Sequence, residues 1–256
     1  HHISVILENY AQSATPLDRL LSEYFRAHKS IGAHDRRAIG ETLYGMVRWK
    51  TLIDHCSRSL HSLDRLSCYR ALSLEVCAQD PTIPEPARLG INDFLYERLC
   101  QLFGLEKTRE IGRILNQNAP TTIRANLLKT TPEHLMQLWE GKFEMKRCAK
   151  APAGIQFKKR EPLFTLPEFT AGLFEVQDEG SQLVAELVQS KPGEHVLDYC
   201  SGSGGKTLAF APGMQGKGQI YLYDNRPWIL IEARKRLRRA GIQNAQFVLP
   251  KQPVDW

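Results

Sequence analysis

Small and charged residues gather in the stretch from Val196 to Thr207, which reads VLDYCSGSGGKT. A short apolar run ends in the carboxylate of Asp198 and passes into glycine and serine, which predicts a buried strand, a tight turn and a helix. Gly202, Gly204 and Gly205 carry no Cβ and can adopt positive φ, so backbone N–H groups can approach a ligand closely at the helix start. Such a loop is typical of a nucleotide or cofactor site.

Two common phosphate-binding motifs do not fit this loop. Gly205, Lys206 and Thr207 spell GKT, but a P-loop of the form G-x-x-x-x-G-K-T requires glycine at position 200, which is Cys200. A dinucleotide motif that starts at Gly202 requires glycine where Thr207 stands. The spacing therefore favours S-adenosylmethionine over a nucleoside triphosphate or NAD.

An acidic residue ends the next predicted strand. The segment QIYLYD, residues 219–224, ends in Asp224, which lies 26 residues after Asp198. In doubly wound folds an acid about 20 residues after the first loop contacts ribose hydroxyls. The alternative is that both acids are ordinary strand-end or capping residues, but their agreement with the loop favours the cofactor site.

The composition is that of an ordinary globular protein. Of the 256 residues, 42% are hydrophobic and 24% are charged, and no apolar run approaches the roughly 18 residues that a membrane helix needs. The net charge of +6 favours a polyanionic partner. The six cysteines form no C-x-x-C pair, which argues against a zinc site or a disulfide framework and indicates a reducing, cytoplasmic compartment. The cysteines are Cys56, Cys68, Cys77, Cys100, Cys148 and Cys200.

The first part of the chain is predicted to be a helical bundle. Apolar residues recur at helical spacing from Ile3 to about Leu115, with a break at the three prolines of residues 80–86. Four histidines in this region lack the spacing of metal ligands and are interpreted as packing or surface residues, so no metal site is expected. They are His28, His34, His55 and His61.

The pattern changes after residue 115. A β-branched run between Pro120 and Pro132 predicts a strand, and a helix is predicted over 132–141. Residues 142–160 then gather basic side chains against the single acid Glu144, which is typical of a phosphate-contacting surface. The alternative is a solvated basic connector. The candidate RNA contacts are Lys142, Lys146, Arg147, Lys158, Lys159 and Arg160.

The last part of the chain predicts an incomplete doubly wound sheet. After a short strand over 172–176 and a helix over 178–188, strands are predicted over 196–198, 220–224 and 247–249. The 178–188 helix is expected to bury one apolar side, formed by Leu183, Val184, Leu187 and Val188. A doubly wound sheet needs about five or more strands, so the sequence is expected to be a fragment or to lack segments of such a domain.

These segments closely resemble the Nop/Sun family of RNA (cytosine-5) methyltransferases, and most of all its bacterial members that act on small-subunit ribosomal RNA. The resemblance rests on NAPTTIRANLLKT, GLFEVQDEGSQLVAELV, VLDYCSGSGGKT, YLYDNR and the helix ending RLRRAGIQN. It implies an α/β protein with an all-helical, NusB-like RNA-binding domain over 1–115. A small basic α+β linking subdomain over 116–170 and the N-terminal part of a Rossmann-like methyltransferase domain over 171–256 would follow.

The resemblance also implies the cofactor. The family loop has the form C-A-A-P-G-G-K, whereas this loop reads C-S-G-S-G-G-K, so Gly202 and Ser203 replace Ala and Pro and predict a more flexible loop. S-adenosylmethionine is expected to bind the loop and the acid after the second strand. The cofactor-binding candidates are Cys200, Ser201, Gly202, Ser203, Gly204, Gly205, Lys206 and Asp224.

The family's chemistry requires cysteines in other motifs. A thiolate adds to carbon 6 of cytosine, carbon 5 then attacks the methyl group, and a second cysteine with a nearby acid assists elimination. In the family these residues follow the fourth and fifth strands, in D-A-P-C-S and T-C-S, whereas this sequence ends at Trp256. No catalytic residue is therefore assigned, Cys56 and Cys200 are interpreted as decoys, and these 256 residues alone are expected not to methylate RNA.

The predicted function is S-adenosylmethionine-dependent methylation of cytosine carbon 5 in RNA. Ribosomal RNA is favoured over transfer RNA, and a cytoplasmic monomer without membrane association is expected. Two other classes stay open. One is an RNA-binding module with a vestigial or truncated cofactor domain. The other is a different nucleotide-dependent Rossmann enzyme, which thermal shifts with NAD and with S-adenosylhomocysteine would distinguish.

Overall fold

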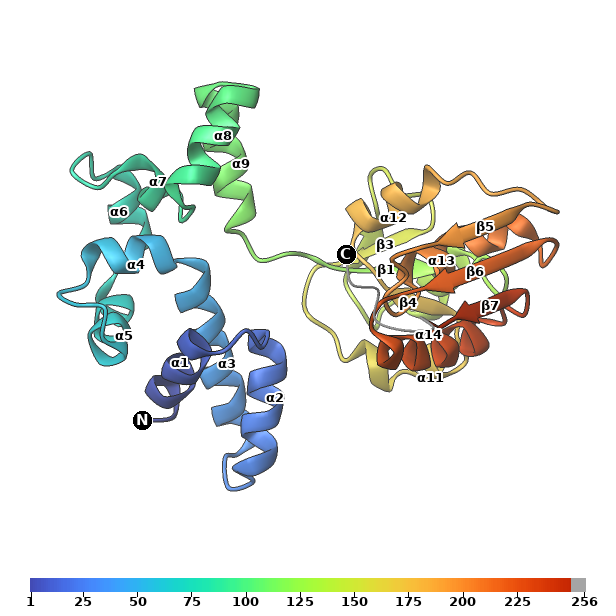
Figure 1. Cartoon of the computed structure of the whole chain (residues 1–256), viewed down its shortest axis with the longest axis horizontal. Helices are drawn as coiled ribbons and strands as arrows, with labels where there is room; N and C mark the ends of the chain where they lie inside the picture. The colour runs from blue at the N-terminus through green and yellow to red at the C-terminus, as the bar shows by residue number, and fades with distance from the viewer. Residues whose placement is uncertain (250–256) are drawn as a thin grey trace. The chain divides into compact units, whose positions relative to one another are not determined.

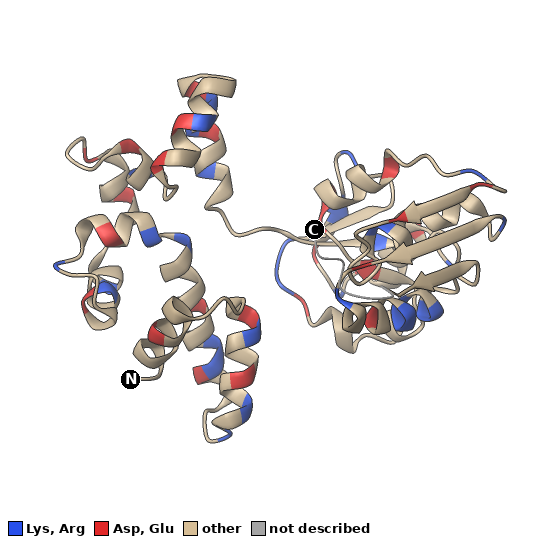
Figure 2. Ribbon diagram, viewed as in Figure 1, with Lys and Arg blue, Asp and Glu red and all other residues tan. Residues whose placement is uncertain are grey.

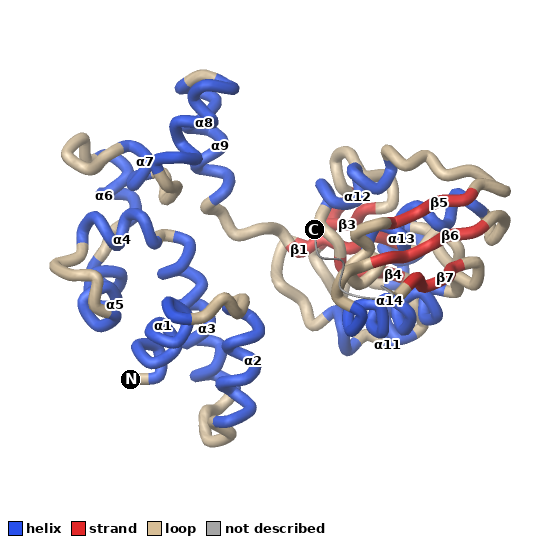
Figure 3. Tube along the Cα trace, in the orientation of Figure 1, coloured by secondary structure: helices blue, strands red, loops and turns tan. Residues whose placement is uncertain are grey.

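The computed structural model describes residues 1–249, which form two compact units (Figure 1). The first unit is His1–Asn118, and the second begins at Ala119. Helices build the first unit, and the strands of the described residues all lie in the second (Figure 3). The start of the second unit lies close to the change of pattern after residue 115. The predicted boundary near residue 170 stays a prediction.

Amphipathic helices pack around small apolar cores in the first unit. Ile6, Leu21 and Leu43 come from three different helices and are buried in one cluster, because each recurs on the inward side of its helix. The helices are α1 (His2–Gln12), α2 (Leu17–Ala27), α3 (Ala33–Arg48), α4 (Lys50–Cys56), α5 (Ser62–Ala71), α6 (Leu74–Gln79), α7 (Glu85–Arg88), α8 (Asp93–Phe103) and α9 (Leu105–Leu115). No helix among residues 1–249 is both long and apolar enough to cross a membrane.

The second unit begins with an antiparallel sheet in the order β2-β3-β1-β4. Trp139 is fully buried beneath it and packs its ring against Phe157 and Phe174. The strands are β1 (Thr121–Ala125), β2 (Met145–Arg147), β3 (Gly154–Phe157) and β4 (Phe174–Val176). Its helical segments are α10 (Pro132–Leu138), η1 (Leu163–Thr165) and α11 (Pro167–Thr170).

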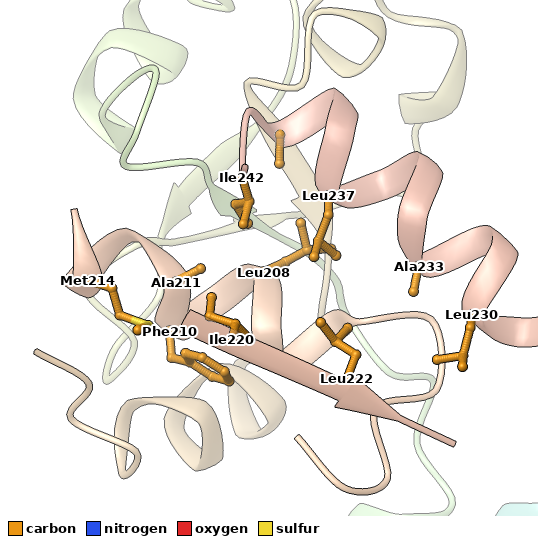
Figure 4. Close-up of a cluster of buried hydrophobic side chains, with 11 residues drawn as sticks. Leu208, Phe210, Ala211, Met214, Ile220, Leu222, Leu230, Ala233, Leu237 and Ile242 are labelled. Carbon is orange, nitrogen blue, oxygen red and sulfur yellow. The ribbon is translucent and has the colours of Figure 1, made fainter. Parts of the chain in front are cut away.

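A parallel sheet follows, in the order β5-β6-β7. Leu230, Ala233 and Leu237 of α14 point towards Ile220 and Leu222 of β6 and close the core on this face (Figure 4). The strands are β5 (His195–Asp198), β6 (Gln219–Tyr223) and β7 (Ala245–Val248). The helical segments are α12 (Glu179–Glu186), α13 (Gly205–Phe210), η2 (Ala211–Met214) and α14 (Pro227–Ala240). The three strands predicted for the last part of the chain correspond to β5, β6 and β7 within a few residues.

Two expectations about burial are wrong. The strand before the loop was expected to be buried, but Leu197 is 57% exposed, because β5 is an edge strand of the sheet among residues 1–249. In α12 the buried side chains are Gln182 and Ala185, whereas Val184 of the predicted apolar side is exposed. Gln182 takes the inward position because its amide donates to the backbone oxygens of Ile123 and Gln177.

The basic segment 142–160 contains regular secondary structure that the sequence did not predict. It contains β2 and β3, which pair antiparallel with Lys146 opposite Gln156. Its inward residues Ile155 and Phe157 join the core around Trp139. The strands were not predicted, because lysine and arginine dominate this segment and its inward and outward residues alternate over only a few positions.

Candidate cofactor site

The predicted loop and the predicted acid meet at the carboxyl edge of the parallel sheet. Parallel strands end at the same edge, so the segment after β5 and the segment after β6 become neighbours. The Ser201 amide donates to the Tyr223 oxygen at 3.0 Å, and the Gly202 amide donates to Asp224 Oδ2 at 2.9 Å. The side chains of Tyr199 and Tyr223 stack beside these bonds, with ring centroids 4.9 Å apart.

Asp198 fixes the helix that begins after the loop. The Thr207 hydroxyl donates to Asp198 Oδ2 at 2.7 Å, and the Thr207 side chain is fully buried. This bond joins the end of β5 to the first turn of α13. The sequence identified Thr207 only as part of a misleading GKT triplet, because its partner lies nine residues back along the chain.

Asp224 is buried and highly hydrogen bonded. Its Oδ1 accepts from the Arg226 amide at 3.0 Å and from Arg226 Nε at 2.9 Å, and its Oδ2 accepts from Arg226 Nη2 at 3.2 Å besides the Gly202 amide. The side-chain hydrogen bonds from Arg226 are the main reason that the pKa of Asp224 falls to about 2; burial opposes the change, and the two backbone amides add to it.

A cavity of about 340 Å³ opens beside the loop. Ser201 is buried against it, and its hydroxyl has no hydrogen-bond partner among residues 1–249. A buried hydroxyl without a partner costs free energy, so this atom is suited to a bound ligand. The lining residues are Val176, Gln177, Asp178, Ser181, Asp198, Cys200, Ser201, Ser203, Gly205, Lys206 and Arg236.

The glycines of the loop have different structural roles. Gly204 has a φ of +78°, and a Cβ there would lie 2.8 Å from Leu237 Cδ1 of the core. A Cβ at Gly205 would meet nothing within 4 Å, and Gly205 lines the cavity. Gly202 has a φ of +52°, and a Cβ there would make only an ordinary contact, 4.0 Å from Ile229 Cδ1. Gly204 is thus required by the turn and the core beneath it, and Gly205 leaves room on the cavity side.

Arg236 holds the loop at the position where the family has proline. Its Nη1 donates to Ser203 Oγ at 2.6 Å and to the Ser203 oxygen at 3.1 Å. Its Nη2 lies 3.0 Å from Glu175 Oε2, and Arg239 pairs with the other oxygen of Glu175. The loop is therefore clamped from β4 and α14. Sequence reasoning missed Arg236 and Glu175, although the latter lies in the quoted FEVQDEGSQL segment.

The same segment links the antiparallel sheet to the loop. Arg124 Nε on β1 donates to Gln177 Oε1 at 2.8 Å, and Gln177 Nε2 donates to the Gly205 oxygen at 3.2 Å. Burial lowers the pKa of Arg124 to about 10, with nearby Glu175 opposing that change. Asp178 caps α12 by accepting from the Ser181 amide at 2.8 Å.

The six candidate RNA contacts lie on or next to the β2–β3 pair, and none of them lines this cavity. Two of them are already paired: Arg147 with Glu133 at 2.7 Å and Lys158 with Glu144 at 2.8 Å. The Lys158 ammonium, through its hydrogen bond, lowers the pKa of Glu144. Lys159 and Arg160 are exposed just beyond β3.

The six thiols are free, and Cys200 is the one that lines the cavity among residues 1–249. The described residues hold no cluster of three histidine, cysteine or acidic side chains that could bind a metal ion. S-adenosylmethionine, the cofactor that the sequence implied, fits what these residues offer. The cavity has a hydroxyl without a partner among the described residues, open space at Gly205, and both carboxylates and cations.

Two family models match the chain between residues 91 and 252. The model of the ferredoxin-like domain of RsmF/B-like methyltransferases matches residues 91–163, and the model of the ubiE/COQ5 methyltransferase family matches residues 174–252. The first match begins just before α8 and continues through β3, so it includes helices of the first unit. The methyltransferase fold predicted for the last part of the chain is confirmed.

Similar proteins carry related names. A probable ribosomal RNA small subunit methyltransferase B of Synechocystis is 33% identical over 60% of this chain and 35% of its own length. The 25S rRNA (cytosine-C(5))-methyltransferase nop2 of Schizosaccharomyces pombe is 30% identical over 62% of this chain and 27% of its own. The crystal structure of a methyltransferase homologue from Pyrococcus horikoshii is 32% identical, with a TM-score of 0.59 over 66% of this chain and 56% of that one.

These matches confirm the resemblance to the Nop/Sun RNA (cytosine-5) methyltransferases that the sequence motifs predicted. The chain spans about a quarter to a third of the length of these curated relatives.

Proposed function

We propose that this protein takes part in the methylation of carbon 5 of cytosine in RNA. We also propose that it binds S-adenosylmethionine in the cavity beside residues 200–206. The observation that carries the proposal is the buried Ser201 hydroxyl, which lacks a hydrogen-bond partner among residues 1–249 and lies in a loop that runs from a parallel strand into a helix. Its support is the similarity to methyltransferases over the same residues.

The charges of the cavity suit this cofactor. S-adenosylmethionine carries a carboxylate, an ammonium and a sulfonium, and when bound it supplies an electrophilic methyl group. Lys206 and Arg236 can form ion pairs with the carboxylate of the cofactor, while Asp178 and Asp198 can attract its ammonium and sulfonium groups. Asp224, beside the loop, is proposed to hold the ribose hydroxyls.

The proposed substrate is RNA, with small-subunit ribosomal RNA favoured over transfer RNA. The candidate contacts Lys142, Lys146, Arg147, Lys158, Lys159 and Arg160 stay part of this proposal, as do a cytoplasmic location, a monomeric state and the three-part division at residues 115 and 170. We also propose that Cys200 takes part in cofactor binding and not in attack on the base. A residue of the cofactor loop is poorly placed to reach a base that lies beyond the methyl group.

Calorimetry tests the cofactor. S-adenosylmethionine and S-adenosylhomocysteine should bind, whereas NAD should not, and Ser201→Ala should weaken the binding because the orphaned hydroxyl is removed. Equal binding of NAD would favour a different nucleotide-dependent Rossmann enzyme.

Transfer of a tritiated methyl group to undermodified small-subunit ribosomal RNA tests the reaction. Transfer that Cys200→Ala abolishes would contradict the role given to Cys200.

A further inference from the structure

A second cavity, of about 450 Å³, lies between α14 and β7, which is an edge strand of the parallel sheet within residues 1–249. Arg234 and Arg238 line it from the helix, and Gln246 and Phe247 line it from the strand. No carboxylate is among the residues that line it within the described part of the chain. It therefore combines two planar cations, an amide and an aromatic ring without a negative charge.

The periodicity of α14 places its two cavity-lining arginines on the outward side of the helix. Leu230, Ala233 and Leu237 face the core, so Arg234 and Arg238, one turn apart, face outward. Figure 2 shows the basic residues of α14 as blue segments of its ribbon. Gly241, with a φ of +87°, ends the helix and returns the chain to β7 beside it.

Two exposed apolar residues extend the same surface towards the carboxyl edge of the sheet. Trp228 is 64% exposed and Ile231 is 61% exposed, and they precede Arg234 by six and three residues on α14. Because the helix begins just after Asp224, this stripe runs from the edge that holds the candidate cofactor site to the second cavity. This stripe therefore places exposed apolar side chains beside the cations of the second cavity.

The two guanidinium groups are available to a ligand. Neither Arg234 nor Arg238 forms an ion pair with a carboxylate of residues 1–249, whereas the nearby Glu232 lies 3.8 Å from Lys235. The Arg234 guanidinium lies over the Phe247 ring, 4.8 Å from its centroid. Arg147 and Lys158 of the candidate RNA segment, in contrast, are already paired with acids.

We infer that the α14–β7 groove binds single-stranded RNA, with Arg234 and Arg238 on phosphates and Phe247 with Arg234 as a stacking platform for a base. This inference rests on the proposed function for the choice of RNA. Arginine suits this role because its planar group stacks on bases and donates two parallel hydrogen bonds to phosphate. Single strands are favoured over duplexes because their bases are free to stack on aromatic side chains.

The test is fluorescence anisotropy on the whole chain with a labelled RNA of about 12 nucleotides, as a single strand and as a duplex, across roughly 50 to 200 mM salt. The double variant Arg234→Gln with Arg238→Gln should lower the slope of log affinity against log salt by about 1.4, since each phosphate contact on a single strand contributes about 0.7. Phe247→Leu should weaken single-strand binding about fivefold or more with the slope unchanged, because it keeps the apolar packing and removes the stacking face.

The matched control removes two other exposed charges, with Lys217→Gln and Lys235→Gln, and should leave affinity and slope near those of the unchanged protein. Urea unfolding of each variant shows whether the fold is intact. An unchanged slope in the folded arginine double variant overturns the inference. So does preferential binding to duplex RNA that Phe247→Leu does not affect, or arginine-dependent binding to vesicles containing phosphatidylserine without any to RNA.

Calorimetry with S-adenosylmethionine separates this inference from the proposed function. The arginine double variant should bind the cofactor like the unchanged protein, because neither arginine lines the first cavity. If the unchanged protein fails to bind the cofactor but binds RNA through these arginines, the cofactor proposal fails and the groove stands.

Discussion

Arg226 supplies three of the four hydrogen bonds that the carboxylate of Asp224 accepts from residues 1–249; the Gly202 amide supplies the fourth. The acid proposed to hold the ribose is therefore engaged by a neighbour two residues along the chain. Ribose hydroxyls can reach it only by replacing some of the bonds from the Arg226 side chain, which is half exposed and free to turn outward.

Substitutions at these two positions should have opposite effects on the cofactor. Asp224→Ala should weaken binding of S-adenosylmethionine by about 1 to 3 kcal/mol, because the ribose donors lose their acceptor. Arg226→Ala should strengthen it severalfold, because the competing donor is removed. Calorimetry at one salt concentration measures both. Weaker binding in Arg226→Ala would show that the arginine assists the cofactor and does not compete with it.

The low pKa of Asp224 makes part of the stability depend on pH. Its pKa in the fold is about 2, below the ordinary value of 3.8, so the ionised form is favoured by folding. The contribution is complete above pH 3.8 and is lost as the pH falls through 2. The free energy of unfolding of the unchanged protein should thus exceed that of Asp224→Asn above pH 4. This difference should shrink towards pH 2 in urea titrations, and a difference independent of pH would contradict the assignment.

Neighbouring glycines in the loop offer a second contrast. Gly204→Ala places a Cβ 2.8 Å from Leu237 Cδ1 at a φ of +78°, so it should destabilise the fold by about 1 to 3 kcal/mol. Gly205→Ala meets no atom within 4 Å and should leave the free energy of unfolding nearly unchanged, while it weakens cofactor binding from the cavity side. Urea unfolding and calorimetry on both variants check this. Full cofactor affinity in Gly205→Ala would place the ligand elsewhere.

The sequence predicted the outline of this site because local signals agree there. The alternation in QIYLYD, the glycines after Asp198 and the helical spacing after Pro227 each specify one element, and parallel pairing then brings their ends together. The sequence also suggested equal roles for the glycines. Their difference depends on Leu237, which lies more than thirty residues away and approaches from the core.

The errors share a physical origin in contacts between distant segments. Gln182 is buried because its side-chain amide donates a hydrogen bond to a backbone oxygen of β1. The spacing of apolar residues within α12 gives no sign of that distant partner. β2 and β3 were missed because they are only three and four residues long and are flanked by basic residues such as Lys142 and Lys158. Arg236 received no role from the sequence, and only the fold separates it from the exposed arginines of α14, because its partner Glu175 lies on β4.

The bond between Thr207 and Asp198 should stabilise the start of α13. Thr207→Val keeps the shape of the side chain and removes the hydroxyl, so the buried bond of 2.7 Å is lost. The expected cost is about 1 to 3 kcal/mol, because the bond is to a charged group. Thr207→Ser retains the hydroxyl and is the control, with the smaller loss of one methyl group. Equal unfolding free energies for the valine and serine variants would contradict the role given to the hydroxyl.

Glu175 should be the most sensitive acid of the second unit, since its carboxylate is buried between Arg236 and Arg239. Glu175→Gln keeps the shape and removes the charge, which leaves two largely buried guanidinium groups without compensation. The expected loss is about 3 to 5 kcal/mol in the free energy of unfolding. Glu232→Gln, on the exposed side of α14, is the control and should change it by less than about 1 kcal/mol.

Because Arg236 also holds Ser203, the effect of Glu175→Gln should extend to the loop. Ser203→Ala removes only the hydroxyl that accepts from Arg236 at 2.6 Å, and it should weaken cofactor binding with little loss of stability. Glu175→Gln should weaken that binding as well, and the double variant should lose less affinity than the sum of the two single losses, since both act through one arginine. Calorimetry on the four proteins measures this coupling. Strictly additive losses would mean that the loop is held independently of the Glu175 pair, and the clamp described for Arg236 would then be wrong.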